Sequence, residues 1–451
     1  MNETVGELSE KKEREIGEFI SWWMTEGKVP GMSLILVKNG NIIYSNGFGS
    51  RDLKADLPCT VKTIYGIGSI TKSFTALGIM KLVEKGELEV EDPIIDYLPL
   101  DWDESITIHH LLTHTSGMPS LGVSEVLIAR LIDLEERGVP LGDIDDFYLH
   151  LNNARDEIAA ESGKRFFYFN SGYNLLGQII EKVSGISYQK FIKKEILEPL
   201  SMKRSCFVID DQKDVMTPYF TREEGPTPTE LPVREFSFPA GGLLSPVDEL
   251  INYLIMNMND GKFKGKRLLN ESLFKELYKE HVERENAMYG YGWSVKDFND
   301  KKLIGHGGSI AVASAYIGFT ENIGVVLACN TSPSYSVEAV GKALLNIIEN
   351  KDWREMPFFA RKRRLDMLEG EYETYRRARR ARVKADNGLL RVEFIEKLEK
   401  QSFILIPKKK TIGDFEFYYL DGEGEKNTID FDVKDEADID MYVGRYRLHK
   451  K

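Results

Sequence analysis

The sequence lacks the residue patterns from which metal sites, disulfides and membrane spans are usually built. Its three cysteines, Cys59, Cys206 and Cys329, lie far apart and form no CxxC or zinc-ligand pattern. The seven histidines include no HExxH pair, so we expect no metal and no other cofactor. No run of about 18 apolar residues occurs, so we also expect no membrane-spanning segment.

The chain is also poor in glutamine and in net positive charge. Only four glutamines occur (Gln178, Gln189, Gln212 and Gln401) while Glu and Lys are abundant, a composition typical of hyperthermophile proteins. A net charge of −12 disfavours general affinity for nucleic acid or for anionic membranes. The first residues are acidic and polar, unlike a secretory signal, so we expect a cytoplasmic protein.

Hydrophobic periodicity predicts that an antiparallel sheet is assembled from both ends of residues 1–350. Two β-rich runs flank Asn39-Gly40, which indicates a hairpin. Strand patterns return late, at 289–295, 314–319 and 324–329. Helices predicted at about 5–27 and 335–350 should cover one face of this sheet, and the stretch from about 73 to 240 should form an all-α part.

The composition changes after residue 350. We predict a linker at 351–368 and a small antiparallel β-barrel at 369–451, where about eight short strand-like segments alternate with turn signals. The predicted fold class is therefore α/β with an appended barrel. The arginine-rich stretch 376–382 is more typical of a solvated strand face or an oligomer salt-bridge network than of an RNA site, given the negative net charge.

Ser69 and Lys72 are the first candidates for catalysis. Residues three apart on a helix lie on one face, so a lysine here can reach the serine hydroxyl and serve as its base. For that role its pKa must fall from about 10.4 towards about 7, which burial can achieve. The same SxxK spacing occurs at Ser9, Ser187 and Ser272, but only Ser69 combines a Gly-Ile-Gly approach with an apolar helix after it.

Two further segments supply polar groups that such a serine needs. In Tyr168-Phe169-Asn170, the tyrosine could hold a phenolate or relay a proton to the leaving group, and the asparagine could hydrogen-bond Lys72 or a substrate amide. Taken alone, Tyr168 could instead be an aromatic residue of the core, and His306, in the second segment, could be a loop residue without a catalytic role.

The second of these segments, His306-Gly307-Gly308, is predicted to lie on or just before a strand. Its two glycines would let a substrate backbone approach the strand edge. The backbone N–H groups of Ser309 and Ser69 could then form an oxyanion hole.

Together these three segments resemble, in order and rough spacing, the serine β-lactamase-related hydrolases. That group includes penicillin-binding proteins, class C β-lactamases, D-aminopeptidases and CubicO-type peptidases and esterases. The supporting segments are Ile108–Pro119, Asn170–Gly185, Pro239–Gly242 and Tyr289–Trp293, and the resemblance covers about residues 10–350. It implies a β-lactamase-like antiparallel sheet flanked by helices with an all-α subdomain, and catalytic roles for Ser69, Lys72, Tyr168 and His306.

The third motif departs from the Lys-Thr-Gly of many β-lactamases. A histidine at position 306 resembles the peptidases and esterases of the group that act on D-amino acids. We therefore expect a serine peptidase that cleaves short peptides, with His306 positioning substrate or assisting a proton. The alternatives are a carboxylesterase or β-lactam-reactive hydrolase of the same fold, or a ligand-binding sensor without turnover. The barrel resembles lipocalin-like domains of archaeal CubicO-type peptidases that form closed oligomers, which implies a homo-oligomer.

Overall fold

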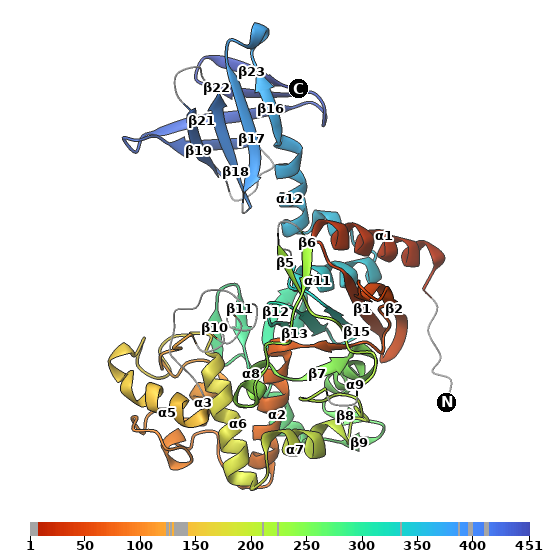
Figure 1. Ribbon diagram of the computed structural model, residues 1–451, viewed down its shortest axis with the longest axis vertical. Helices are drawn as coiled ribbons and strands as arrows, with labels where there is room; N and C mark the ends of the chain where they lie inside the picture. The colour runs from red at the N-terminus through yellow and green to blue at the C-terminus, as the bar shows by residue number, and fades with distance from the viewer. Residues whose placement is uncertain are drawn as a thin grey trace. The chain divides into compact units, whose positions relative to one another are not determined.

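The chain folds into two compact units, Met1–Glu349 and Asn350–Lys451. Figure 1 shows the computed structural model. The structure describes residues 8–122, 126, 129, 143–209, 212–222, 225–333, 336–386, 388–395, 400–409 and 415–451. The segment expected to be a linker contains a helix, α12 (Pro357–Leu368), and belongs to the second unit.

A nine-stranded antiparallel sheet forms the centre of the first unit (Figure 1). Its strand order is β10-β11-β12-β13-β14-β15-β1-β2-β3, so the N-terminal hairpin lies beside the late strands, as predicted. The strands are β10 (Val282–Arg284), β11 (Ala287–Tyr289), β12 (Ser294–Phe298), β13 (Lys301–Ser309), β14 (Ser314–Phe319), β15 (Ile323–Cys329), β1 (Gly31–Lys38), β2 (Asn41–Asp52) and β3 (Leu57–Pro58). The register between β1 and β15, from Met32↔Cys329 to Lys38↔Ile323, joins the two ends of the unit.

The strand predicted at 289–295 is broken in the structure. β11 ends at Tyr289 and β12 begins at Ser294, because Gly292 adopts a φ of +75° and approaches the backbone of α2. A Cβ at Gly292 would lie 2.8 Å from the Lys72 carbonyl oxygen, so only glycine fits there. The break therefore places this glycine-rich segment directly against the helix that carries Lys72.

Helices cover both faces of the sheet. α1 (Glu10–Glu26) and α11 (Val337–Ile348) pack together, and α11 lies on β13, β14 and β15, as predicted for the first and last helices. α9 (Val247–Met258) contacts β1, β14 and β15 from the other side, where its Leu254 side chain lies against Gly324. One face thus belongs to the terminal helices, and the other faces the helical part that carries the site.

The helical part lies between the hairpin and the late strands in the sequence. Its helices are α2 (Thr71–Glu84), α3 (Ile108–Leu112), α5 (Ile144–Asn153), α6 (Asn170–Ser184), α7 (Tyr188–Ile192) and α8 (Phe238–Gly241), and α10 (Glu271–Glu276) follows later. Short strands also occur near it: β4 (Ile64–Gly66) pairs with β7 (Leu244–Pro246), β5 (Tyr219–Arg222) with β6 (Gly225–Pro228), and β8 (Lys262–Phe263) with β9 (Lys266–Arg267). The β5–β6 hairpin is a departure from the all-α prediction for this stretch.

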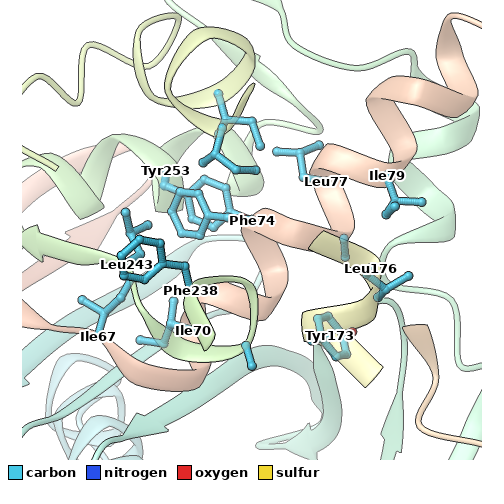
Figure 2. Close-up of a cluster of buried hydrophobic side chains, with 14 of the residues drawn as sticks. Ile67, Ile70, Phe74, Leu77, Ile79, Tyr173, Leu176, Phe238, Leu243 and Tyr253 are labelled. Atoms are coloured by element: carbon cyan, nitrogen blue, oxygen red, sulfur yellow. The ribbon is translucent and has the colours of Figure 1, made fainter. Parts of the chain in front are cut away.

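Helix α2 is the centre of this packing. Every residue from Thr71 to Met80 is buried, including the polar ones in the first turn, so other elements surround this part of the helix on all sides. Phe74 stacks on Tyr253 of α9 with 3.9 Å between ring centroids, and Figure 2 shows both rings near Leu243 and Phe238. Because α2 is held from several sides, the first turn and the residues before it have little freedom to move.

The second unit is a closed antiparallel barrel, as predicted. Its strands are β16 (Gly370–Glu373), β17 (Arg380–Asp386), β18 (Leu389–Ile395), β19 (Lys400–Pro407), β20 (Glu416–Leu420), β21 (Lys426–Val433), β22 (Ile439–Val443) and β23 (Tyr446–Lys450). β16 pairs with both β17 and β23, which closes the ring. Alternate residues such as Leu390, Val392 and Phe394 of β18 point into the core, which explains the strand-like sequence pattern.

The three cysteines form no disulfide in the described structure. Cys59 and Cys329 are buried free thiols, and Cys206 is a half-buried one. Over the described part of the chain, the helices are too short or too polar to cross a lipid bilayer.

Candidate active site

Ser69 lies in the single helical turn Gly68–Ile70 that leads into α2. Gly68 has a φ of +52°, which turns the chain so that the serine hydroxyl meets the first turn of α2. The Lys72 Nζ atom donates to Ser69 Oγ at 3.0 Å and to the Ala240 carbonyl oxygen at 2.6 Å. The predicted contact between Ser69 and Lys72 is therefore present in the structure.

Lys72 is fully buried in this position. Among the ion pairs of the described residues, none involves this amine. Burial without a counter-charge disfavours the ammonium form and lowers the pKa of Lys72 to about 7. A substantial fraction of the lysine is thus a neutral amine near neutral pH, which is the form that can accept the proton of Ser69.

Tyr168 approaches the same pair from the segment before α6. Its hydroxyl forms a hydrogen bond with Ser69, and Lys72 Nζ lies 4.9 Å from the centre of its ring. Although 39% of the residue is exposed, the hydroxyl end is buried, and this burial raises the pKa of Tyr168 to about 12. Tyr168 is therefore a neutral phenol near pH 7. Asn170 is half-buried at the first position of α6, two residues further on.

Strand β13 brings the third motif to the site. His306, Gly307, Gly308 and Ser309 are its last residues, and they pair with β14 on one side. β12 pairs with β13 only as far as Gly305, so no strand among the described residues pairs with the other edge of His306–Ser309. This open edge is where an extended peptide could add as a further strand.

The two glycines of this motif differ in what surrounds them. A Cβ at Gly307 would meet nothing within 4 Å, whereas a Cβ at Gly308 would lie 1.9 Å from the Ile67 carbonyl oxygen and 2.9 Å from the Ser69 nitrogen. Gly307 therefore faces open space, and its role in admitting substrate stays a prediction, while Gly308 lets β13 contact the nucleophile segment. Gly68 has the same role from the other side, since its Cβ would lie 2.6 Å from the Ser309 nitrogen.

This difference predicts that an alanine at position 308 disturbs the site, whereas an alanine at position 307 is accommodated without loss of stability. Gly308→Ala should push Ile67–Ser69 away from β13 and lower kcat/KM by about 100-fold, because displacements near 1 Å misplace the reacting groups. Gly307→Ala should leave the unfolding temperature unchanged, since it enters open space, and it controls for the added methyl group. Thermal unfolding and steady-state kinetics of both variants measure this, and equal behaviour of the two would contradict it.

His306 points into the same region, with its ring centroid 6.4 Å from that of Tyr168. The side chain is buried, and burial together with nearby Lys72 lowers the pKa of His306 to about 3. Its Nε2 atom lies 3.1 Å from the Tyr289 hydroxyl, which in turn lies 3.3 Å from Nε2 of His114. His114 and Tyr289 were given no role from the sequence, although both lie in segments that carry the family resemblance.

A cavity of about 290 Å³ opens beside these residues. Tyr168, His306 and Gly307 line it on the side of the motifs, and Arg284 and Lys296 contribute positive charge. Glu338 also lines it, and its pairing with Lys342 and Lys296 lowers the pKa of this carboxyl to about 2. Ser69 and Lys72 are not among the residues that line this cavity, which adjoins the site through Tyr168, His306 and Gly307. The site therefore combines a serine, a base of suitable pKa and a neutral phenol, with a cavity beside them.

One group of possible metal ligands occurs among the described residues, and it lies in the barrel. Asp438, Asp440 and His449 have ligand atoms within 4.8 Å of one another. Asp440, however, already accepts a hydrogen bond from Arg447 at 2.6 Å, which is the main reason its pKa falls to about 2. Because this buried carboxylate is neutralised by side-chain cations, the group is explained as an ion-pair network.

Comparison with known proteins agrees with this geometry. Residues 10–348 match the model of the Beta-lactamase family, and residues 353–449 match that of the Pab87 octamerisation domain. The protein flp of Staphylococcus aureus (strain N315) is 28% identical over 355 residues, which is 76% of this chain and 68% of that protein. Penicillin-binding protein 4* of Bacillus subtilis (strain 168) is 34% identical over 174 residues, or 38% of this chain and 37% of that one.

Two solved structures extend the comparison to the fold. The octameric penicillin-binding protein homologue from Pyrococcus abyssi superposes with a TM-score of 0.90 at 36% identity, over 97% of this chain and 99% of that chain. A penicillin-binding protein from Bacillus halodurans has a TM-score of 0.60 at 26% identity, over 73% of this chain and 98% of that chain. Sequence, fold and site geometry therefore lead to one conclusion: the chain belongs to the beta-lactamase family.

Proposed function

We propose that this chain is a serine peptidase that cleaves short peptides, including peptides with D-residues, through an acyl-enzyme on Ser69. The observation that carries the proposal is the 3.0 Å contact between Ser69 Oγ and a buried Lys72 whose pKa is lowered to about 7. A serine hydroxyl needs such a base to become a nucleophile. The fold of the serine hydrolases in this family is consistent with that reaction.

In the proposed reaction, neutral Lys72 takes the proton of Ser69 as Oγ attacks the substrate carbonyl. The tetrahedral oxyanion is held by the backbone N–H groups of Ser69 and Ser309, on the two segments that Gly68 and Gly308 allow to meet. Tyr168, a neutral phenol, gives its proton to the leaving amine and regains one from the Lys72 ammonium. Water then attacks the acyl group and releases the acid, which restores Ser69.

The substrate class is the finer part of the proposal. The open edge of β13 favours an extended peptide, and in the proposal Asn170, at the start of α6, binds its amide. The histidine at 306, in place of the lysine of many β-lactamases, favours peptides over β-lactams. An ester substrate would use the same nucleophile and base, so the esterase alternative differs only in the leaving group.

A matched set of substrates separates these alternatives. Short peptides with L- or D-residues, the corresponding esters and a penicillin are incubated with the protein, and turnover and the mass of the chain are followed. We expect amide turnover and a transient acyl adduct on the tryptic peptide that contains Ser69. Ester turnover without amide turnover would support the esterase, and one stable adduct per chain without turnover would support the sensor.

We also propose that the chain forms a homo-oligomer through its barrel. The octamerisation-domain match at residues 353–449 and the likeness to an octameric homologue support this. Removal of residues 350–451 should leave a monomer, because the first unit has its own core. Light scattering of both forms measures their masses, and an unchanged oligomer after truncation would reject the role of the barrel.

A further inference from the structure

A continuous chain of hydrogen bonds runs behind the candidate nucleophile. The backbone N–H of Phe169 donates to His114 Nδ1 at 2.9 Å, and His114 Nε2 lies 3.3 Å from the Tyr289 hydroxyl. That hydroxyl lies 3.1 Å from His306 Nε2, and His306 Nδ1 lies 2.6 Å from the Gly307 carbonyl oxygen. The three side chains in the middle are all buried.

The two ends of this chain fix which ring nitrogen of each neutral imidazole carries the proton. A backbone N–H only donates, so His114 Nδ1 must accept and its proton must sit on Nε2, facing Tyr289. A carbonyl oxygen only accepts, so His306 Nδ1 must carry its proton and Nε2 must accept from Tyr289. The Tyr289 hydroxyl satisfies both demands at once. Tyr173 donates its own proton to the Leu112 carbonyl oxygen at 2.8 Å, so its oxygen is a second acceptor within reach of the Tyr289 hydroxyl, and the proposal below directs that hydroxyl at His306.

This arrangement requires both imidazoles to be neutral. Burial is the main cause that lowers the pKa of His114 and of His306, and the charges of Lys72 and Arg284 act in the same direction on both. Neutral His306 then has both ring nitrogens engaged within the protein. It has neither a free lone pair nor a free proton to offer to a substrate, which changes the role that we expected from its sequence motif.

His114 hydrogen-bonds the residues on both sides of Tyr168. Its carbonyl oxygen accepts from Phe167 N at 2.8 Å while its side chain accepts from Phe169 N at 2.9 Å. Its ring also lies 4.4 Å, between centroids, from the ring of Tyr168. His114 adopts a φ of +60°, an unfavourable conformation for a residue with a side chain, which is tolerated where the surroundings require it.

We propose that His114 and Tyr289 are positioning residues, which tie the Tyr168 segment to β13 and hold His306 as a neutral Nδ1–H tautomer that positions Gly307 rather than transferring protons. This inference rests on the proposed function, hydrolysis through Ser69. It assigns His114 and Tyr289 the role of holding the catalytic segments in place without contacting substrate. The relative placement of Tyr168 and the β13 edge, both adjacent to Ser69, is then set by one hydroxyl.

The kinetic test compares two tyrosines of the same segment. Tyr289→Phe removes the central hydroxyl, whereas Tyr291→Phe removes a hydroxyl that contacts His109 Nδ1 at 2.8 Å, outside the chain described above. We expect Tyr289→Phe to lower kcat by about 10-fold or more with KM within a few-fold, because geometry and not substrate contact is lost. Tyr291→Phe should retain wild-type kinetics, and equal kinetics of the two variants would overturn the proposal.

Conservative variants of His114 separate positioning from packing. The amide oxygen of Asn can replace Nδ1 as the acceptor for Phe169, so His114→Asn should behave like Tyr289→Phe, and the double variant should be no slower than either single one. His114→Ala loses the acceptor as well and should be slower than His114→Asn. Fully additive losses in the double variant would show that the two residues do not act through one chain.

Neutron diffraction from crystals of the wild-type protein grown in D2O locates the protons directly. We expect deuterium on His114 Nε2, on the Tyr289 hydroxyl directed at His306, and on His306 Nδ1 but not on Nε2. Deuterium on His306 Nε2 would overturn the proposal even if the tyrosine variants fail to fold. If no substrate is turned over and Ser69 is never acylated, the proposed function fails, while this measurement still decides the hydrogen-bond chain.

Discussion

Ser69→Ala should abolish turnover of every substrate that the native protein accepts, with a loss of about 10⁴-fold or more in kcat. The expected cause is the loss of the hydroxyl oxygen that lies 3.0 Å from Lys72 Nζ and that also bonds Tyr168. Without it, Lys72 has no hydroxyl to deprotonate and no acyl-enzyme can form. Residual activity would come from the other groups of the site acting on a bound water.

The chain offers a matched control for this substitution at Ser272. Ser272 and Lys275 have the same spacing, but they lie on α10, where Lys275 pairs with Glu271 at 2.8 Å on the surface. Ser272→Ala should keep full activity and full labelling by a serine-directed fluorophosphonate, whereas Ser69→Ala should lose both. Normal turnover by Ser69→Ala, with a folded protein by circular dichroism, would eliminate the acyl-enzyme mechanism altogether.

Lys72→Met should lower kcat/KM by about 10²–10⁴-fold, the usual contribution of a general base. Methionine fills a similar volume in the buried site but cannot accept the proton of Ser69. In the native protein kcat/KM should rise with pH through about 7, as the amine loses its proton, and this limb should be absent from the residual activity of the variant. A limb that persists in Lys72→Met would assign the ionisation to another group.

Protein stability provides an independent check on the same lysine. The pKa of Lys72 is about 7 in the folded protein and near its ordinary value of 10.5 when unfolded. Between these values the unfolded chain holds a proton that the folded chain has lost, so the stability of the native protein should rise with pH relative to Lys72→Met. Denaturant unfolding at pH 7 and pH 10 measures the difference. Parallel pH dependence of both proteins would place the lysine in a solvated environment.

Much of the fold could be predicted because strands, helices and turns each have a characteristic residue pattern over a short stretch of sequence. The Asn39-Gly40 turn, the short apolar runs of β14 and β15, and the eight strand-like segments of the barrel all depend on neighbours in the sequence. The break between Tyr289 and Ser294 could not be predicted, because it depends on the close approach of Gly292 to the Lys72 backbone. Helix α12 in the expected linker was missed for a different reason, because its basic sequence shows little amphipathic pattern.

The candidate site shows the same division. Spacing along one helix was enough to pair Ser69 with Lys72, and the separate motifs were enough to nominate Tyr168, Asn170 and His306. The roles of these residues remain predictions that the variants above test. What the motifs could not convey is the environment, such as the burial that lowers the pKa of Lys72 or the hydrogen bonds that occupy both nitrogens of His306.

The sequence by itself determined the motifs, the strand and helix pattern, the barrel and the family resemblance, because each depends on residue types at short spacing. Only the tertiary structure decided which groups share a buried space, which glycine touches the nucleophile segment and which partners the ring nitrogens of His114 and His306 meet. The physical reason is that pKa values and hydrogen-bond polarity depend on desolvation and on partners that are distant along the chain. These partners, Phe169 and Gly307 among them, meet only when α2, α6 and β13 are packed together.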